Sequence, residues 1–289
     1  MSTLLTVEKE RTFYSLYKED PSVIQGPIYL AWVLLFVMCF GLIGNIGIVV
    51  LTYRNSRLKN SCNYLLALLC LSDCIHQFGH FSYIYRMFTG NYFLSLKSCF
   101  LLQMIPLIGT LFGAILPLII SIDRLLSCFF PRFHLALKPS VYGIFVFSIS
   151  GLYIFVNFYA ATKQISEHGD QLMLCAVPDP LLSQRPTNLI YQLSVGLMNT
   201  MAVSIYATVW IRLSSQKHQS DGSKRAFKAL FAIIFSLLGS WVAGAIGQLI
   251  LMSIDAGPQQ FFYSLAITGV CINLVCAIVT IDMLFEVNL

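Results

Sequence analysis

The chain has 289 residues, of which 57% are apolar and only 11% are charged, and this is more apolar surface than a core of this size can hide from water. These proportions exclude a set of soluble domains and indicate a protein that crosses a membrane several times. The net charge of +5 is spread over short segments between apolar runs, so no basic patch for nucleic acid is visible.

Residues 1–26 are expected to form an extracellular N-terminal tail. They mix basic and acidic side chains and contain no apolar run of the length found in a signal peptide. The first spanning helix is therefore expected to act as its own insertion signal.

Seven apolar runs are long enough to cross a membrane as helices. They fall at about 27–51, 63–85, 98–123, 139–161, 188–212, 226–252 and 261–284. The sequence therefore predicts an all-α membrane protein, a seven-transmembrane helix bundle. We expect one receptor-sized domain over residues 27–285 and a very short tail over residues 286–289.

Basic residues are unevenly distributed between the two sets of connections. The first, third and fifth connections hold eleven of them, whereas the N-terminal tail and the other connections hold seven. Because Lys and Arg are enriched in cytoplasmic loops, we expect the N-terminus outside and the C-terminus in the cytosol.

The longest outer connection, residues 162–187, mixes charges with Gly and Pro and is expected to be an ordered or semi-ordered loop that lies over the bundle. Of the nine cysteines, Cys99 at the outer end of the third run and Cys175 in this connection share an oxidising compartment. The sequence predicts a disulfide between them, and two unpaired outer thiols are the alternative. The other cysteines are expected to stay reduced in the spans or on the inner side.

The third run carries one stripe of polar and small residues on an otherwise apolar helix. Steps of three and four place on this stripe Cys99, Gln103, Pro106, Thr110, Gly113, Pro117, Ser121 and Arg124. We expect the stripe to face protein and the Leu/Ile face to meet lipid or other helices. Such a helix, with a cysteine at one end and charges at the other, is a candidate for carrying a signal across the membrane.

Asp73 lies in the middle of the second run, and His76 and His80 follow it on the same helical face. A carboxylate inside a membrane is costly and usually serves a function or is paired. A sodium ion, a proton or a polar network are the candidate occupants, and a hydrogen-bonded network with Asn45 and Asn273 is favoured. A transition metal is disfavoured, because no second cluster completes its coordination, and no cofactor is expected.

Polar residues in the outer and middle bundle are candidates for binding a ligand. They are Gln103, Thr110, Asn199, Trp241 and Gln248. Trp241 is either a movable plug beneath a pocket or simple filling between helices.

Asp123 and Arg124 lie at the predicted cytosolic end of the third run. They are either a charge that stops translocation or a local ion pair that weakens when a partner offers Arg124 other contacts.

Together these residues resemble the rhodopsin-like G-protein-coupled receptors. The shared motifs are Gly44-Asn45, Leu71-Ser72-Asp73, Cys99 with Cys175, and Asp123-Arg124-Leu125, where that family has Asp-Arg-Tyr. More narrowly, the chain is similar to the nematode serpentine chemoreceptors of class SX. The motifs for this class are residues 57–63 (RLKNSCN), the Asp73/His76/Gly79-His80 run, Ile122 to Leu125, and Tyr206.

The resemblance implies a chemosensory receptor in the plasma membrane of a sensory neuron. Its outer half would bind a small-molecule or peptide ligand, and its Arg124 end would engage a heterotrimeric G protein. The seventh run departs from the wider family, because it reads NLVCA from Asn273 where that family has Asn-Pro-x-x-Tyr. A receptor-like protein that does not signal is therefore an alternative.

A proton- or ion-coupled transporter is a further alternative, since Asp73, His76 and His80 could relay protons. The absence of internal repeats disfavours it. No nucleophile, base and carboxylate are predicted to share one layer of the bundle, so an enzyme is not expected.

Overall fold

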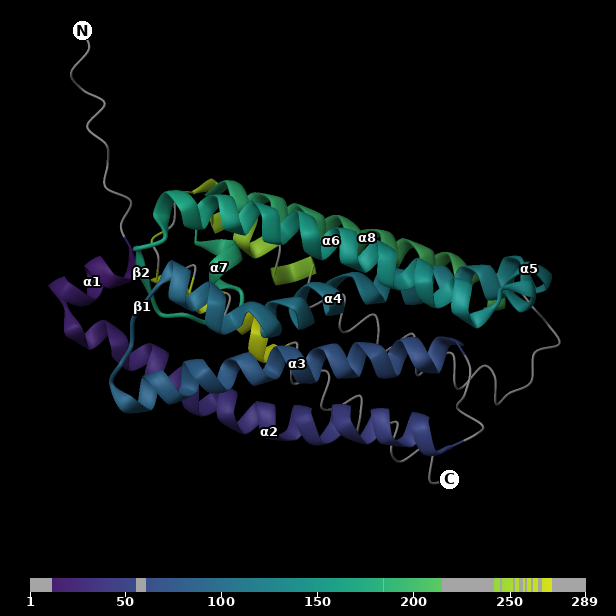
Figure 1. The fold of residues 1–289 in the computed structure, drawn as a ribbon, viewed down its shortest axis with the longest axis horizontal. Coiled ribbons are helices and arrows are strands. Elements are labelled where there is room, and N and C mark those ends of the chain that lie inside the picture. Colours follow the sequence, from purple (N-terminus) through teal and green to yellow (C-terminus); the bar gives the residue numbers. More distant parts are fainter. Residues whose placement is uncertain are drawn as a thin grey trace, which may run out of the picture.

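The computed structural model describes residues 12–55, 61–183, 185–214, 242–244, 246–251, 253–254, 257, 259–260, 262–264 and 267–271. Over these residues the protein is mostly helical, and its long helices run side by side as a bundle (Figure 1). Trp241 and Asn273 lie outside the described residues, as do most of the sixth and seventh predicted spans.

Five long helices coincide with the first five predicted spans. They are α2 (Gln25–Arg54), α3 (Ser61–Thr89), α4 (Leu96–Phe129), α6 (Pro139–His168) and α8 (Arg185–Ser214). Shorter elements lie between them: α1 (Phe13–Glu19), the 3-10 helix η1 (Pro21–Ile24), α5 (Pro131–Ala136) and α7 (Asp179–Leu182). Two short strands, β1 (Leu94–Ser95) and β2 (Leu172–Met173), pair antiparallel with Leu94 opposite Met173.

Four helical stretches in the described part of the chain are long and apolar enough to cross a membrane. They are Pro21–Arg54, Leu96–Phe129, Ser140–His168 and Thr187–Leu213. Large apolar side chains such as Phe36, Leu152 and Phe155 are exposed along them, which suits contact with lipid. The helix α3 has 29 residues but is not in this set, because polar residues such as Asp73 and His76 lower its mean hydropathy.

The helix α4 packs against α3, α6 and α8. Its predicted protein-facing stripe is buried from Cys99 to Ser121, and Arg124 is partly buried. Leu101 and Ile105 on another face are exposed. The sequence prediction for the two faces of this helix is therefore confirmed.

The helices α3 and α4 approach each other closely at Gly109. A Cβ at this position would lie 2.7 Å from the Ser72 carbonyl oxygen and 2.8 Å from the His76 backbone nitrogen. Both atoms belong to the α3 backbone, which cannot move aside as a flexible side chain would. Glycine therefore lets the two backbones come together here.

Part of the predicted tail forms the helix α1, which the apolar-run criterion missed because the segment is short. Thr12 and Ser15 cap it reciprocally: the Ser15 N–H donates to Thr12 Oγ1 (3.2 Å), and the Thr12 N–H donates to Ser15 Oγ (3.1 Å). The Phe13 ring lies 5.5 Å from the Phe262 ring. The helix α1 thus packs at the end of the bundle that also holds β1 and β2 (Figure 1).

The helix α6 extends beyond the apolar run of the fourth predicted span, from residue 161 to His168. The added residues, TKQISEH, include good helix formers that are polar, so a search for apolar runs does not see them. After α6 the described residues of the connection form β2 and α7. The side chain of Gln164 donates a hydrogen bond to Ser183 Oγ and links the two sides of the connection.

Candidate functional site

A disulfide and backbone hydrogen bonds fix the outer connection to the first turns of α4. Cys99 is bonded to Cys175, with their Cα atoms 5.5 Å apart, which confirms the predicted pair. Nearby, the Leu96 N–H donates to the Gln171 carbonyl (2.8 Å) and the Lys97 N–H donates to the Gly169 carbonyl (3.0 Å). The connection and α4 are therefore held together as one unit.

One turn deeper, Gln103 joins three segments of the chain. Its side chain is completely buried, and its Nε2 lies 2.8 Å from Ser82 Oγ and 3.2 Å from the Gly79 carbonyl oxygen, both in α3. The same Nε2 lies 3.4 Å from the Cys175 carbonyl oxygen. The structure therefore gives this predicted ligand-binding residue a structural contact between α3, α4 and the outer connection.

The outer connection also contains an acidic group with an altered pKa. Asp179, at the start of α7, accepts a hydrogen bond at Oδ2 from the Ala176 N–H (2.7 Å). Burial raises the pKa of its carboxyl to about 6, and this hydrogen bond offsets part of that rise. The charge of Asp179 therefore changes close to neutral pH.

In the middle of the bundle, Thr110 contacts His76. The Thr110 hydroxyl lies 3.0 Å from the Pro106 carbonyl, to which it donates, and its Oγ1 lies 2.7 Å from His76 Nδ1. Since the hydroxyl has one proton and the carbonyl takes it, we assign His76 Nδ1 as a donor to Thr110. This contact fixes the orientation of the His76 ring.

The His80 ring lies 4.8 Å from the His76 ring, nearly perpendicular to it. His80 is buried, and neither of its ring nitrogens has a hydrogen-bond partner among the described residues. Within the described ranges, no group of three or more His, Cys, Asp or Glu side chains is placed to hold a metal ion.

The predicted network around Asp73 is described only in part. A Cβ at Gly113 of α4 would lie 3.5 Å from Asp73 Oδ1, so the carboxylate faces this small residue. Asn45 of α2 is buried, and its Nδ2 has no hydrogen-bond partner within the part of the chain that the structure describes. Since Asn273 lies outside the described residues, the network of these three residues stays a prediction.

Asn199 and Gln248 are the other predicted ligand-binding residues that the structure describes. Asn199 of α8 is buried, and its Nδ2 donates to the Val195 carbonyl in its own helix (2.8 Å). Gln248 is also buried, and among the described residues its side-chain oxygen and nitrogen have no hydrogen-bond partner.

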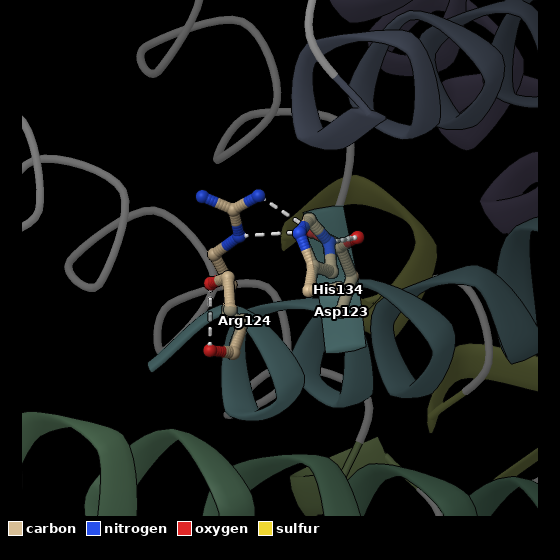
Figure 2. Close-up of polar contacts among 4 residues, drawn as sticks. Asp123, Arg124 and His134 are labelled. Atoms are coloured by element: carbon tan, nitrogen blue, oxygen red, sulfur yellow. Dashed lines mark hydrogen bonds and ion pairs between the residues drawn. The ribbon is translucent and has the colours of Figure 1, made fainter. Parts of the chain in front are cut away.

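At the opposite end of α4, Asp123 and Arg124 form an ion pair. Arg124 donates to Asp123 Oδ2 from Nε (3.1 Å) and from Nη2 (2.5 Å). Figure 2 shows the two side chains and the ring of His134, whose Nε2 lies 2.9 Å from the other oxygen of Asp123, Oδ1. The carboxylate thus has a different partner on each oxygen.

Residues from three other helices lie around this ion pair. Cys62 of α3 and Tyr206 of α8 are buried and lie within electrostatic reach of Arg124, and Tyr142 of α6 lies within reach of Asp123. A movement of any of these helices would therefore change the surroundings of the pair.

Sequence reasoning missed His134. The sequence does contain one signal for the helix α5, which is Pro131 soon after the end of α4. Proline is favoured at the first position of a helix. This signal indicates a short helix in the third connection, but it does not show that the histidine of that helix turns back to Asp123.

The sequence of this chain is similar to those of known membrane receptors. Residues 38–285 match the family described as serpentine type 7TM GPCR chemoreceptor Srsx. Human C-C chemokine receptor type 4 is 22% identical over 225 residues, which are 75% of this chain and 61% of that receptor, so the chain spans about three-fifths of the length of this curated relative. The family match covers most of the chain, including the disulfide and the ion pair. The chain therefore belongs to the Srsx family of seven-transmembrane G-protein-coupled chemoreceptors, which is a family of multi-pass membrane receptors and not of enzymes.

Proposed function

We propose that this protein is a plasma-membrane chemoreceptor that converts the binding of an extracellular ligand into activation of a heterotrimeric G protein. In this proposal seven helices cross the membrane, the disulfide end lies outside, and the Asp123–Arg124 end lies in the cytosol. One observation carries the proposal: a single helix, α4, joins the disulfide-bound end to the ion pair at the other end and packs against three helices between them.

The ligand would bind in the outer and middle parts of the bundle, where the candidate residues are Gln103, Thr110, Asn199, Trp241 and Gln248. Gln248 supports this position, because a buried amide without hydrogen-bond partners is unfavourable until a ligand or water supplies them. A small, mostly apolar molecule with a few polar groups fits such a site, and a peptide that enters from the outer connection is the other class.

Activation would follow from a shift between two states of the bundle. A ligand moves this equilibrium only by its difference in affinity for the two states, and each tenfold difference supplies about 1.4 kcal/mol. In the resting state Asp123 holds Arg124, and in the active state Arg124 leaves the pair for contacts with the G protein. Because Arg124 is 24% exposed while Asp123 is completely buried, the arginine is the partner that can leave.

The test is nucleotide exchange on a panel of purified G proteins, with the receptor in membranes and with a mixed ligand library. We expect some ligand fraction to stimulate exchange through the unchanged receptor but not through the Arg124→Ala variant. The Arg212→Ala variant is the matched control, because Arg212 is an exposed arginine in the last turn of α8. Equal stimulation through Arg124→Ala would contradict the coupling role. Ligand binding without exchange on any G protein would favour a receptor that does not signal.

A second candidate function, proton- or ion-coupled transport, is favoured by one observation. His80 lies against His76 inside the bundle, and neither of its ring nitrogens has a hydrogen-bond partner. Such histidines can pass protons along a path through a membrane. Flux in sealed vesicles that is lost in the Asp73→Asn variant would support transport, and vesicles without flux would exclude this candidate.

A further inference from the structure

The short helix α5 places His134 on the carboxylate that also holds Arg124. Its Nε2 lies 2.9 Å from Asp123 Oδ1, while both contacts of Arg124 are to Oδ2 (Figure 2). Asp123 is completely buried, and the His134 side chain is 18% exposed. The carboxylate of Asp123 is therefore shielded from water. The strength of its contact with Arg124 depends on the strength of its contact with His134.

The backbone of this region fixes the position of His134. Phe130 lies between α4 and α5 as the cap of both helices, Pro131 begins α5, and the His134 N–H donates to the Phe130 carbonyl (2.9 Å). One turn of helix thus brings the imidazole back to the side of α4. Proline suits this start because its φ angle is already helical and it has no N–H to leave unpaired.

Asp123 is the one negatively charged group near His134 within the part of the chain that the structure describes. Arg124 lies beside it on α4, and Arg132 is an exposed cation on α5 itself. The groups around the ion pair that carry no charge at neutral pH are Cys62 of α3, Cys128 of α4, Tyr142 of α6 and Tyr206 of α8. The cation Arg212 of α8 lies within electrostatic reach of Cys128. A proton on His134 would therefore place a second cation on a carboxylate that already pairs with Arg124.

We infer that His134 is a positioning residue whose protonation weakens the hold of Asp123 on Arg124 and so favours coupling at acidic cytosolic pH. This inference rests on the proposed coupling role of Arg124. A neutral imidazole donates one ordinary hydrogen bond and leaves Arg124 as the only cation on the carboxylate. A charged imidazole makes a stronger, charge-assisted bond to Asp123 and repels the guanidinium nearby. Imidazole is the side chain that changes charge between about pH 5 and pH 8, which makes it suitable for this role.

The first experiment measures ligand-independent nucleotide exchange at pH 7.5 and pH 6.0 on the inner side, with the spontaneous exchange of the G protein subtracted at each pH. We expect the unchanged receptor to be several-fold faster at pH 6.0. The His134→Gln variant keeps a neutral donor and should stay at the pH 7.5 rate, whereas His134→Lys carries a permanent cation and should be fast at both pH values. His168→Gln, at an exposed histidine at the far end of α6, should keep the normal profile. A His134→Gln variant with the normal pH profile would overturn the inference.

The second experiment needs no G protein and separates this inference from the proposed function. In receptor labelled with 15N-arginine, the Arg124 Nε–H signal is identified by its loss in Arg124→Lys. Between pH 7.5 and pH 6.0 this signal should move toward the position of an exposed arginine such as Arg132, and it should not move in His134→Gln. If no variant stimulates exchange but the signal behaves in this way, the proposed function fails and the role of His134 stands. The same signal change in the unchanged receptor and in His134→Gln would overturn the inference.

Discussion

The side-chain nitrogen of Gln103 lies 2.8 Å from the hydroxyl oxygen of Ser82, and this contact joins α4 to α3 one turn from the disulfide. The same nitrogen is near the carbonyl oxygens of Gly79 and Cys175. Gln103 therefore lies where two helices and the outer connection meet.

Replacement of Gln103 by alanine should destabilise the receptor, because it removes buried hydrogen bonds that join α4 to α3 and to the outer connection. We expect a loss of roughly 1–3 kcal/mol in the free energy of unfolding, measured by thermal or chemical unfolding in detergent. Asn199→Ala is the matched control, since Asn199 is a buried amide that bonds within its own helix, and its loss should be smaller. Equal losses in the two variants would show that the contacts of Gln103 between segments contribute little.

Removal of the disulfide should loosen the outer connection. Cys99 and Cys175 close a loop with a sequence separation of 76, and the double Cys→Ala variant should lose roughly 2–4 kcal/mol of stability. In the same variant, the backbone amides near Gly169 and Gln171 should become less protected from hydrogen exchange. Cys39→Ala, at a free and exposed cysteine, should change neither quantity. Unchanged protection in the double variant would mean that the backbone contacts alone hold the connection.

Two glycine-to-alanine changes should have effects of opposite sign. Gly109→Ala places a methyl group against the α3 backbone, so we expect a loss of about 1–3 kcal/mol in stability. Gly151 of α6 has no neighbouring atom within 4 Å of an added Cβ, and alanine there should raise helix stability by up to about 1 kcal/mol. Thermal unfolding of both variants tests this, and a tolerated Gly109→Ala would contradict the close approach of α3 and α4.

The stability of the outer connection should depend on the charge of Asp179. Its pKa is raised from 3.8 to about 6, so the folded state favours the protonated form. The contribution of Asp179 to stability is therefore largest below about pH 4, and it is lost as the pH rises through 6. Asp179→Asn should stabilise the receptor at pH 7.5 by about 1–2 kcal/mol and have little effect at pH 4. Asp170→Asn, at an exposed aspartate in the same connection, is the control, and equal pH dependence in the two variants would contradict the assignment.

Much of the fold could be predicted from the sequence because long apolar runs are a strong signal. The five long helices and the buried stripe of α4 follow from the length and periodicity of such runs. The disulfide could be predicted because the sequence assigns Cys99 and Cys175 to the same side of the membrane.

The contacts that define the candidate site could not be predicted in the same way. Gln103 was identified as polar and protein-facing, but its partners Gly79 and Ser82 depend on the register between α3 and α4, which a single sequence does not give. The contact of His134 with Asp123 depends on the bend between α4 and α5, where helical periodicity ends. Tertiary packing decides both.

The central claim is that Asp123 keeps Arg124 in a resting position, and the Asp123→Asn variant tests it most directly. Asparagine has nearly the same shape but no charge, so it should hold the guanidinium more weakly. Ligand-independent nucleotide exchange should then rise on the order of fivefold or more, because a coupling free energy of about 1 kcal/mol or more is removed. The comparison uses a G protein that the unchanged receptor activates. If the Asp123→Asn receptor reaches the membrane but stimulates nucleotide exchange only at the rate of the unchanged receptor, this account is contradicted.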